Sequence, residues 1–237
     1  MDVVFFDLDD TLYDQAEPFV RAYREVFGHQ FDDAVTSPEQ LFALSRKHSE
    51  SVFEASERGD MSMEDMYVYR IQKALEDYGI EVDAQSCLRM HYLYAHNQEH
   101  AISLTPTICA VLDWCCENAR PGIISNGPAD HQLAKMDLLG VRRWMPEEAI
   151  VISSLVGVAK PDPGIFELAC ERLNTKPEHC VYVGDSFGPD IAGACSAHMP
   201  AVWFDRRGRP ATTADKPNWI VHTEQELLEL MPSLIRS

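Results

Sequence analysis

The chain has 237 residues, of which 46% are hydrophobic and 24% are charged, a composition that is typical of one or two folded domains and excludes a disordered chain. Its 38 acidic residues outnumber its 20 lysines and arginines and give a formal net charge of -18, which repels nucleic-acid backbones and anionic membrane surfaces. No segment approaches the ~18 consecutive apolar residues of a membrane span, and seven cysteines without a Cys-x-x-Cys spacing are typical of a reducing compartment. We therefore expect a cytoplasmic protein without a nucleic-acid or membrane partner.

Short apolar runs rich in β-branched and aromatic residues recur along the chain, and helical patterns separate them. Such runs are typical of strands that are buried on both faces of a parallel sheet. Their alternation with helices predicts an α/β fold with a Rossmann-like, three-layer core, in which helices cover both faces of an open sheet. The predicted strands are residues 3–6, 122–124, 149–152, 180–183 and 201–204.

The strand signal is absent between about residues 15 and 100, where the pattern is helical. Ser37 begins the spacing of a helix capping box, and Ser62 and Asp83 are placed to cap two further helices. This segment reads as an all-helical domain inserted after the first strand. The predicted domains are a catalytic core of residues 1–14 and 101–237 and a helical cap of residues 15–100.

Polar side chains follow the ends of the predicted strands, where open α/β sheets bind their ligands. Carboxylates that gather at one edge of a sheet repel one another unless a cation neutralises them. Because the set is rich in oxygen and lacks clustered His or Cys, it favours a hard ion such as Mg²⁺ over zinc. A lysine and neutral donors beside the carboxylates suit an oxyanion such as phosphate. The side chains are Asp7, Asp9 and Asp10 after the first strand, Ser125 and Asn126 after the second, Lys160 after the third, and Asp185 and Asp190 after the fourth.

Four short motifs, in this order along the chain, resemble those of the haloacid dehalogenase superfamily. They cover essentially the whole chain at family-like spacing, and four motifs in register are far more specific than any one of them. The resemblance implies an enzyme of the phosphatase branch with a helical cap of the first (C1) subclass and Mg²⁺ as cofactor. The motifs are Asp-Leu-Asp-Asp-Thr-Leu at 7–12, Ser-Asn-Gly at 125–127, Lys-Pro at 160–161, and Gly-Asp-Ser at 184–186 with Asp190.

The resemblance also implies a role for the residues of the first and fourth motifs. Asp7 would be the nucleophile that forms an aspartyl-phosphate. Asp9 would protonate the leaving oxygen and then deprotonate the attacking water, which calls for a pKa raised toward neutrality. Mg²⁺ would be held by the Asp7 carboxylate, the backbone carbonyl of Asp9 and Asp185.

The remaining motif residues would act on the phosphate. Lys160 would be both catalytic and phosphate-binding, together with Ser125 and Asn126. Asp190 would act from outside the ligand shell by orienting Lys160 or a metal-bound water. The substrate would then be a small phosphorylated metabolite.

The stretch Gly157–Pro161 and the general layout are similar to house-cleaning nucleotidases, so a nucleoside monophosphate is the first substrate to expect, ahead of sugar phosphates.

Three alternative functions stay open. A phosphomutase shares every motif. A 2-haloacid dehalogenase is disfavoured by Asp9, because a halide leaves without a proton. A non-catalytic binding protein is disfavoured because a scaffold has no reason to assemble mutually repelling carboxylates. The sequence does not indicate the oligomeric state.

Overall fold

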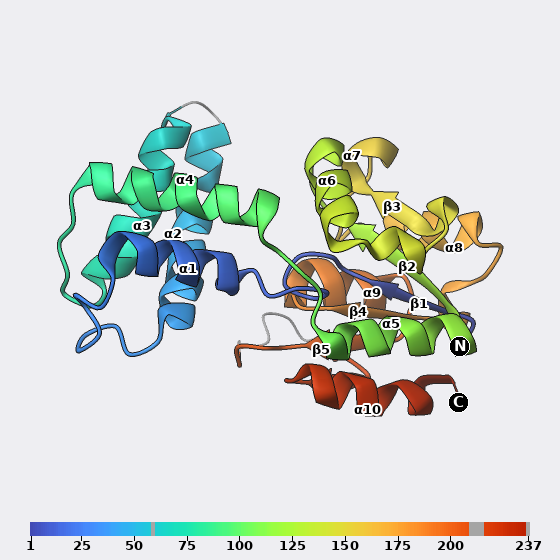
Figure 1. The fold of residues 1–237 in the computed structure, drawn as a ribbon. Coiled ribbons are helices and arrows are strands. Elements are labelled where there is room, and N and C mark those ends of the chain that lie inside the picture. Colours follow the sequence, from blue (N-terminus) through green and yellow to red (C-terminus); the bar gives the residue numbers. More distant parts are fainter. Residues whose placement is uncertain (58–59, 209–215, 236–237) are drawn as a thin grey trace. The chain divides into compact units, whose positions relative to one another are not determined.

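The computed structural model describes residues 1–57, 60–208 and 216–235, and the chain divides into two compact units. One unit contains Met1–Asp14 and Ser103–Ser237, and the other contains Gln15–Ile102. The first unit holds a parallel sheet with its helices, and the second is built from helices (Figure 1). None of the helices in the described ranges is both long and apolar enough to cross a membrane.

The sheet of the first unit is parallel throughout, as the sequence predicts. Its strand order is β3-β2-β1-β4-β5-β6, so the chain builds outward on one side of β1 and then returns to the other side. The carboxyl end of β1 therefore lies at the point where the strand order reverses, which is the usual ligand position in open α/β sheets. The strands are β1 (Val3–Phe6), β2 (Arg120–Ser125), β3 (Ile150–Ile152), β4 (Cys180–Gly184), β5 (Ala201–Phe204) and β6 (Trp219–Val221).

The edge strand β6 is not predicted from the sequence. It has three residues, and its central Ile220 is 51% exposed. A strand this short with an exposed apolar side chain lacks the continuous buried run that identifies the other strands.

Both faces of the sheet are covered, which explains the apolar runs. Val3 and Phe5 belong to a buried cluster that also contains Ile165, Phe166 and Ala194, so α8 and α9 cover that face. Alternate residues of β1 point to the opposite face, where α5 and α10 pack against each other (Figure 1). The helices are α5 (Pro106–Asn118), α6 (Ala129–Leu139), α7 (Ser153–Val156), α8 (Pro163–Arg172), α9 (Gly193–Ser196) and α10 (Glu224–Ile235), with 3₁₀ helices η1 (Val141–Arg143), η2 (Glu147–Ala149) and η3 (Pro177–His179) and a π-helix η4 (Phe187–Ala192).

The second unit contains four helices among its described residues, and the predicted caps begin three of them. The side chains of Ser37, Ser62 and Asp83 accept backbone N–H groups three residues later, at 3.3, 3.1 and 2.8 Å, which satisfies donors that a helix start leaves open. The rings of Phe19 and Phe42 lie 5.3 Å apart in the apolar core of this unit. The helices are α1 (Ala16–Phe27), α2 (Pro38–Glu57), α3 (Met63–Glu76) and α4 (Ala84–His100).

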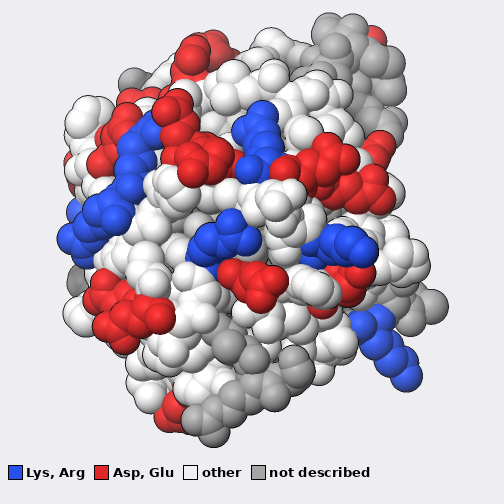
Figure 2. Space-filling view, turned by 90° about the vertical axis from the view of Figure 1, so that its right-hand side faces the viewer, with Lys and Arg blue, Asp and Glu red and all other residues white. Residues whose placement is uncertain are grey.

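Exposed charges of both signs lie side by side on the surface. On the face drawn in Figure 2, acidic side chains lie next to Lys and Arg side chains. Exposed ion pairs such as Lys73–Glu76, at 2.5 Å, stabilise a protein little because water screens them. The stability of the fold therefore depends on its buried contacts.

His91 on α4 is held among aromatic and cationic side chains of the helical unit. Its ring stacks on Tyr67 with centroids 3.5 Å apart, and its Nδ1 lies 2.8 Å from Nη2 of Arg70. Burial, and then the charge of Arg70, lower the pKa of His91 from 6.5 to about 4. Because a guanidinium only donates, Nδ1 of the neutral ring accepts this hydrogen bond.

Acid is therefore expected to destabilise the protein through His91. Between about pH 6.5 and pH 4 the unfolded chain binds a proton at this ring and the folded chain does not, so stability falls as the pH falls. We expect His91→Gln, which cannot titrate, to lose about 1 kcal/mol less than the wild type between about pH 7.5 and pH 5.5. Urea unfolding at the two pH values measures this difference. Equal losses in both proteins would contradict it.

Candidate active site

Three carboxylates meet at the carboxyl ends of the two central strands. Asp7 follows β1, and its N–H donates to the carbonyl of Val183 on β4 at 2.9 Å, so the nucleophile candidate continues the sheet register. Asp185 follows β4, and its carbonyl accepts from Nε1 of Trp203 at 2.9 Å. Asp7, Asp185 and Asp190 are all buried, and each offers an oxygen atom within 4.8 Å of the others.

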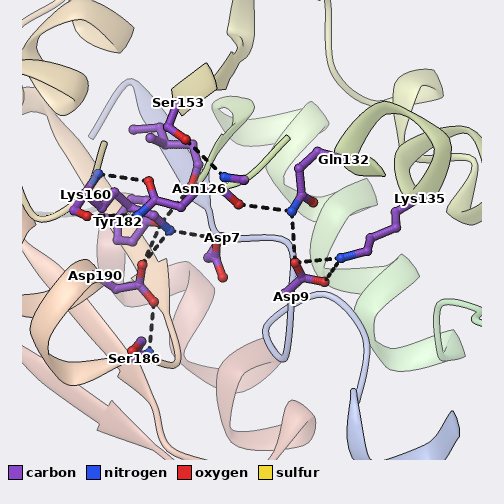
Figure 3. A network of polar contacts seen from close by, with 12 residues as sticks. Asp7, Asp9, Asn126, Gln132, Lys135, Ser153, Lys160, Tyr182, Ser186 and Asp190 are labelled. Carbon is purple, nitrogen blue, oxygen red and sulfur yellow. Dashed lines mark hydrogen bonds and ion pairs between the residues drawn. The ribbon is translucent and has the colours of Figure 1, made fainter. Parts of the chain in front are cut away.

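Lys160 lies against two of these carboxylates. Its Nζ donates to Oδ1 of Asp7 at 2.7 Å, to Oδ1 of Asp190 at 2.6 Å and to the hydroxyl of Tyr182 at 2.8 Å (Figure 3). These bonds use all three N–H groups of the ammonium. Lys160 is buried, so the two close carboxylates supply the counter-charge that a buried lysine needs.

Asp190 is held in place by the backbone of its own loop. Its Oδ2 accepts the N–H of Ser186 at 2.9 Å while Oδ1 accepts from Lys160. Asp190 is also packed against the end of β4, since a Cβ at Gly184 would lie 2.6 Å from its side chain. Asp190 thus contacts Lys160 and also lies within the carboxylate group.

Burial and the neighbouring charges explain the direction in which the pKa values of Asp7 and Lys160 are shifted. Burial raises the pKa of Asp7 well above its usual range, Lys160 opposes this, and Asp190 and Asp185 add to it. Burial acts to lower the pKa of Lys160, but Asp190 and Asp7 outweigh it and the pKa is raised. Three carboxylates face one ammonium, so the ionised cluster carries excess negative charge. An all-oxygen cluster with this excess fits a hard cation such as Mg²⁺.

Asp9 is surrounded by hydrogen-bond donors. Lys135 Nζ donates to Oδ1 and Oδ2 at 2.7 and 2.9 Å, Tyr13 donates to Oδ1 at 2.5 Å, and Gln132 donates to Oδ2 at 3.1 Å. Burial acts to raise the pKa of Asp9, but the charge and hydrogen bond of Lys135, with the bonds from Tyr13 and Gln132, lower it. The expected raised pKa is therefore wrong for this arrangement, because donors that favour the carboxylate surround it.

The Ser-Asn-Gly turn connects the two polar networks. Asn126 Nδ2 donates to the carbonyl of Lys160 at 2.8 Å, and Asn126 Oδ1 accepts the N–H of Lys160 at 2.9 Å. The backbone carbonyl of Asn126 accepts from Gln132 at 3.0 Å, and Ser125 is buried at the end of β2. The side chain of Asn126 therefore positions the Lys160 backbone. The backbone N–H of Asn126 is then the group of this residue that could donate to an anion.

The loop after β5 holds the first motif in place. Arg206 donates from Nε and Nη2 to the carbonyls of Asp10 and Thr11 at 3.1 and 3.0 Å. Arg207 pairs with Oδ2 of Asp10 at 2.8 Å and also with Asp14. Asp10 adopts a left-handed conformation at φ 63°, so these contacts support a loop that turns sharply just after Asp9.

Several of these residues were not identified from the sequence. In the sequence Tyr182 looks like one more apolar position of a strand, although the hydroxyl of a buried tyrosine usually has a hydrogen-bond partner. Gln132 and Lys135 lie three residues apart on α6 and so share a helix face, but nothing in the sequence indicates that this face meets Asp9. The arginines after β5 read as an exposed loop.

Comparisons with known proteins identify a family for this sequence and fold. A sequence model of a family described as "haloacid dehalogenase-like hydrolase" matches residues 1–198. A glyceraldehyde 3-phosphate phosphatase of Methanopyrus kandleri is 28% identical over 98% of this chain and 98% of its own length. A pyrimidine 5′-nucleotidase of Escherichia coli is 25% identical over 97% of both chains. A Bacillus subtilis HAD-hydrolase, solved with bound magnesium, has the same fold with a TM-score of 0.67, at 22% identity over 97% of this chain and 98% of that one.

Proposed function

The chain belongs to the haloacid dehalogenase-like hydrolase family, and on this premise we propose that it is a Mg²⁺-dependent phosphatase that acts on small phosphorylated metabolites through an aspartyl-phosphate on Asp7. The observation that carries the proposal is the position of Asp7. It is buried at the carboxyl end of the central strand, with Oδ1 bound to Lys160 at 2.7 Å and with Asp185 beside it. The two relatives described above are a phosphatase and a nucleotidase, which supports the same chemistry.

Asp7 would perform the first displacement. Lys160 holds its Oδ1, so Oδ2 is the oxygen that would attack phosphorus. A bond forms between Asp7 and phosphorus while the bond from phosphorus to the alcohol oxygen breaks, and that oxygen takes a proton from Asp9. Asp9 must bind this proton first, because the donors around it favour its carboxylate form. The products of this step are the free alcohol and an aspartyl-phosphate.

Hydrolysis of the aspartyl-phosphate would complete the reaction. Asp9, now a carboxylate, takes a proton from water as the water oxygen bonds to phosphorus, and the bond to Asp7 breaks. The release of inorganic phosphate restores Asp7 as a carboxylate and Asp9 as an acid. Two easier displacements thereby replace one difficult displacement.

The all-oxygen cluster is the place for the cation in this proposal. Asp7, Asp185 and the backbone carbonyl of Asp9 would hold Mg²⁺, which when bound would neutralise charge on the transferring phosphoryl group. Ser125 and the N–H of Asn126 would bind the phosphate oxygens, and Lys160 would bind them once one of its three hydrogen bonds opens. The excess negative charge of the carboxylates makes the cation necessary, because a phosphate dianion would otherwise be repelled.

The substrate is proposed as a class. A nucleoside monophosphate remains the first candidate, and triose phosphates and other sugar phosphates follow. This range is supported by relatives that are named for a nucleotide-type and a triose-phosphate substrate while matching nearly the whole chain.

Phosphate release from a panel of esters tests the proposal. The panel contains nucleoside monophosphates, glyceraldehyde 3-phosphate, hexose phosphates and p-nitrophenyl phosphate, each with Mg²⁺ and with EDTA. We expect release with Mg²⁺, loss of release in EDTA and recovery when Mg²⁺ is restored. If no ester is hydrolysed, or if EDTA has no effect, the proposal is wrong. Movement of phosphate within a hexose phosphate without its release would identify a phosphomutase.

A further inference from the structure

The carboxylate of Asp9 has all of its acceptor positions in use. A carboxylate offers about four lone-pair positions on its two oxygens. Tyr13 and Lys135 donate to Oδ1, and Lys135 and Gln132 donate to Oδ2. A proton or a leaving-group oxygen can therefore approach Asp9 only if one of these bonds opens.

Lys135 differs from the other two donors because it bridges both oxygens. It can release the oxygen that takes a proton and keep its bond to the other oxygen. Tyr13 and Gln132 each bind one oxygen, so neither can hold the carboxyl plane alone. The Lys135 side chain is 18% exposed, which gives its Nζ room for the small movement that such an exchange needs.

Helix α6 connects Lys135 to the rest of the site. Gln132 donates both to Asp9 and to the carbonyl of Asn126 (Figure 3), so the same helix face that carries Lys135 is fixed to the Ser-Asn-Gly turn. Gly127 leaves room for this contact, because a Cβ there would lie 2.8 Å from Nε2 of Gln132. Its φ of 131° also suits glycine.

We infer that Lys135 is a positioning residue for the reaction. With Gln132 it holds the Asp9 carboxyl in the orientation from which Asp9 protonates the leaving oxygen. The inference rests on the proposed function, in which Asp9 is the acid. Helix α6, which lies outside the four motifs, would then contribute two positioning side chains to the site.

Loss of Lys135 should slow formation of the aspartyl-phosphate only when the leaving group needs a proton. An alkyl alkoxide is a poor leaving group and depends on the acid, whereas p-nitrophenolate leaves without one. For Lys135→Met we expect kcat/KM, which reports the steps up to release of the alcohol and not the later hydrolysis, to fall by ~10- to 100-fold with β-glycerol phosphate and by less than ~3-fold with p-nitrophenyl phosphate. A general loss of structure would lower both rates equally.

The experiment compares Lys135→Met, Lys135→Gln and Lys135→Arg in the full-length protein with Mg²⁺. Lys135→Arg keeps a bridging cation and should recover most of the β-glycerol phosphate rate. The matched control is Lys176→Met, since the side chain of Lys176 is 74% exposed and lies outside the site. Because Lys135→Gln removes the charge but keeps a donor, it tests the inference even if Lys135→Met does not fold.

A parallel Asp9→Asn variant separates the inference from the mechanism on which it rests. If Asp9→Asn loses β-glycerol phosphate turnover and the Lys135 variants do not, the positioning role is wrong and the proposed function stands. If the Lys135 variants lower kcat/KM equally for both esters, the positioning role is also wrong. If Asp9→Asn keeps full turnover of both esters, the proposed role of Asp9 fails and the inference fails with it.

Discussion

Replacement of Asp7 by asparagine is expected to abolish turnover, with kcat reduced by about 10⁴-fold or more, because the amide cannot form the covalent intermediate. The fold should survive. Burial and the neighbouring carboxylates already disfavour the charged form of Asp7, as its raised pKa shows, and asparagine has nearly the same shape. Phosphate release from the best ester of the panel measures the first effect, and thermal unfolding measures the second.

Asp2 provides the matched control for this variant. It precedes the same strand, and its side chain is 62% exposed, so Asp2→Asn should leave kcat and KM unchanged. If Asp7→Asn retains more than about a tenth of the wild-type kcat, Asp7 is not the nucleophile. If it loses activity only because the protein unfolds, the comparison must be repeated with Asp7→Glu, which should also be inactive in the folded state.

Replacement of Lys160 by methionine is expected to damage both stability and activity. Methionine fills the space of the lysine stem but leaves Asp7 and Asp190 buried without their shared cation. Removal of one partner from a buried ion pair costs about 3–5 kcal/mol of unfolding free energy. Turnover should fall by at least ~10²-fold, because Asp7 loses the bond that orients it and the phosphate loses its cation.

A double substitution tests the physical reason for the loss of stability. Asp190→Asn in the Lys160→Met background removes one of the two orphaned charges, and we expect a coupling energy of about 1–3 kcal/mol, as for other residues in direct contact. Urea unfolding of the two single variants and the double variant gives this coupling. Additive losses would show that Lys160 and Asp190 stabilise the fold independently.

The motif residues were predictable because of where they stand in the chain. Asp7 and Asp185 come directly after strands whose unbroken apolar runs identify them as buried, and neighbouring parallel strands bring their carboxyl ends to one edge. Local sequence alone is enough for that inference. The reversal of strand order at β1, which the sequence does not indicate, places this edge at the usual ligand position of open α/β sheets.

The partners of these residues were not predictable, because they depend on packing between elements. The direction of the Asp9 pKa was expected to be upward, but Lys135 approaches from a helix that begins more than a hundred residues later and lowers it. Arg206 reaches the carbonyls of Asp10 and Thr11 from the other end of the chain. No local pattern indicates these contacts, since each depends on where a helix or loop packs on the sheet.

A covalent phosphate on Asp7 can be detected by acid quench during turnover of the best substrate, followed by tryptic digestion and mass spectrometry. The first tryptic peptide ends at Arg21 and contains both Asp7 and Asp9. The account predicts one phosphoryl group on this peptide, removable by hydroxylamine as an acyl phosphate should be, in the wild type and in Asp9→Asn but not in Asp7→Asn. A phosphoryl group that persists in Asp7→Asn, or rapid phosphate release with no labelled peptide at any quench time, would contradict it.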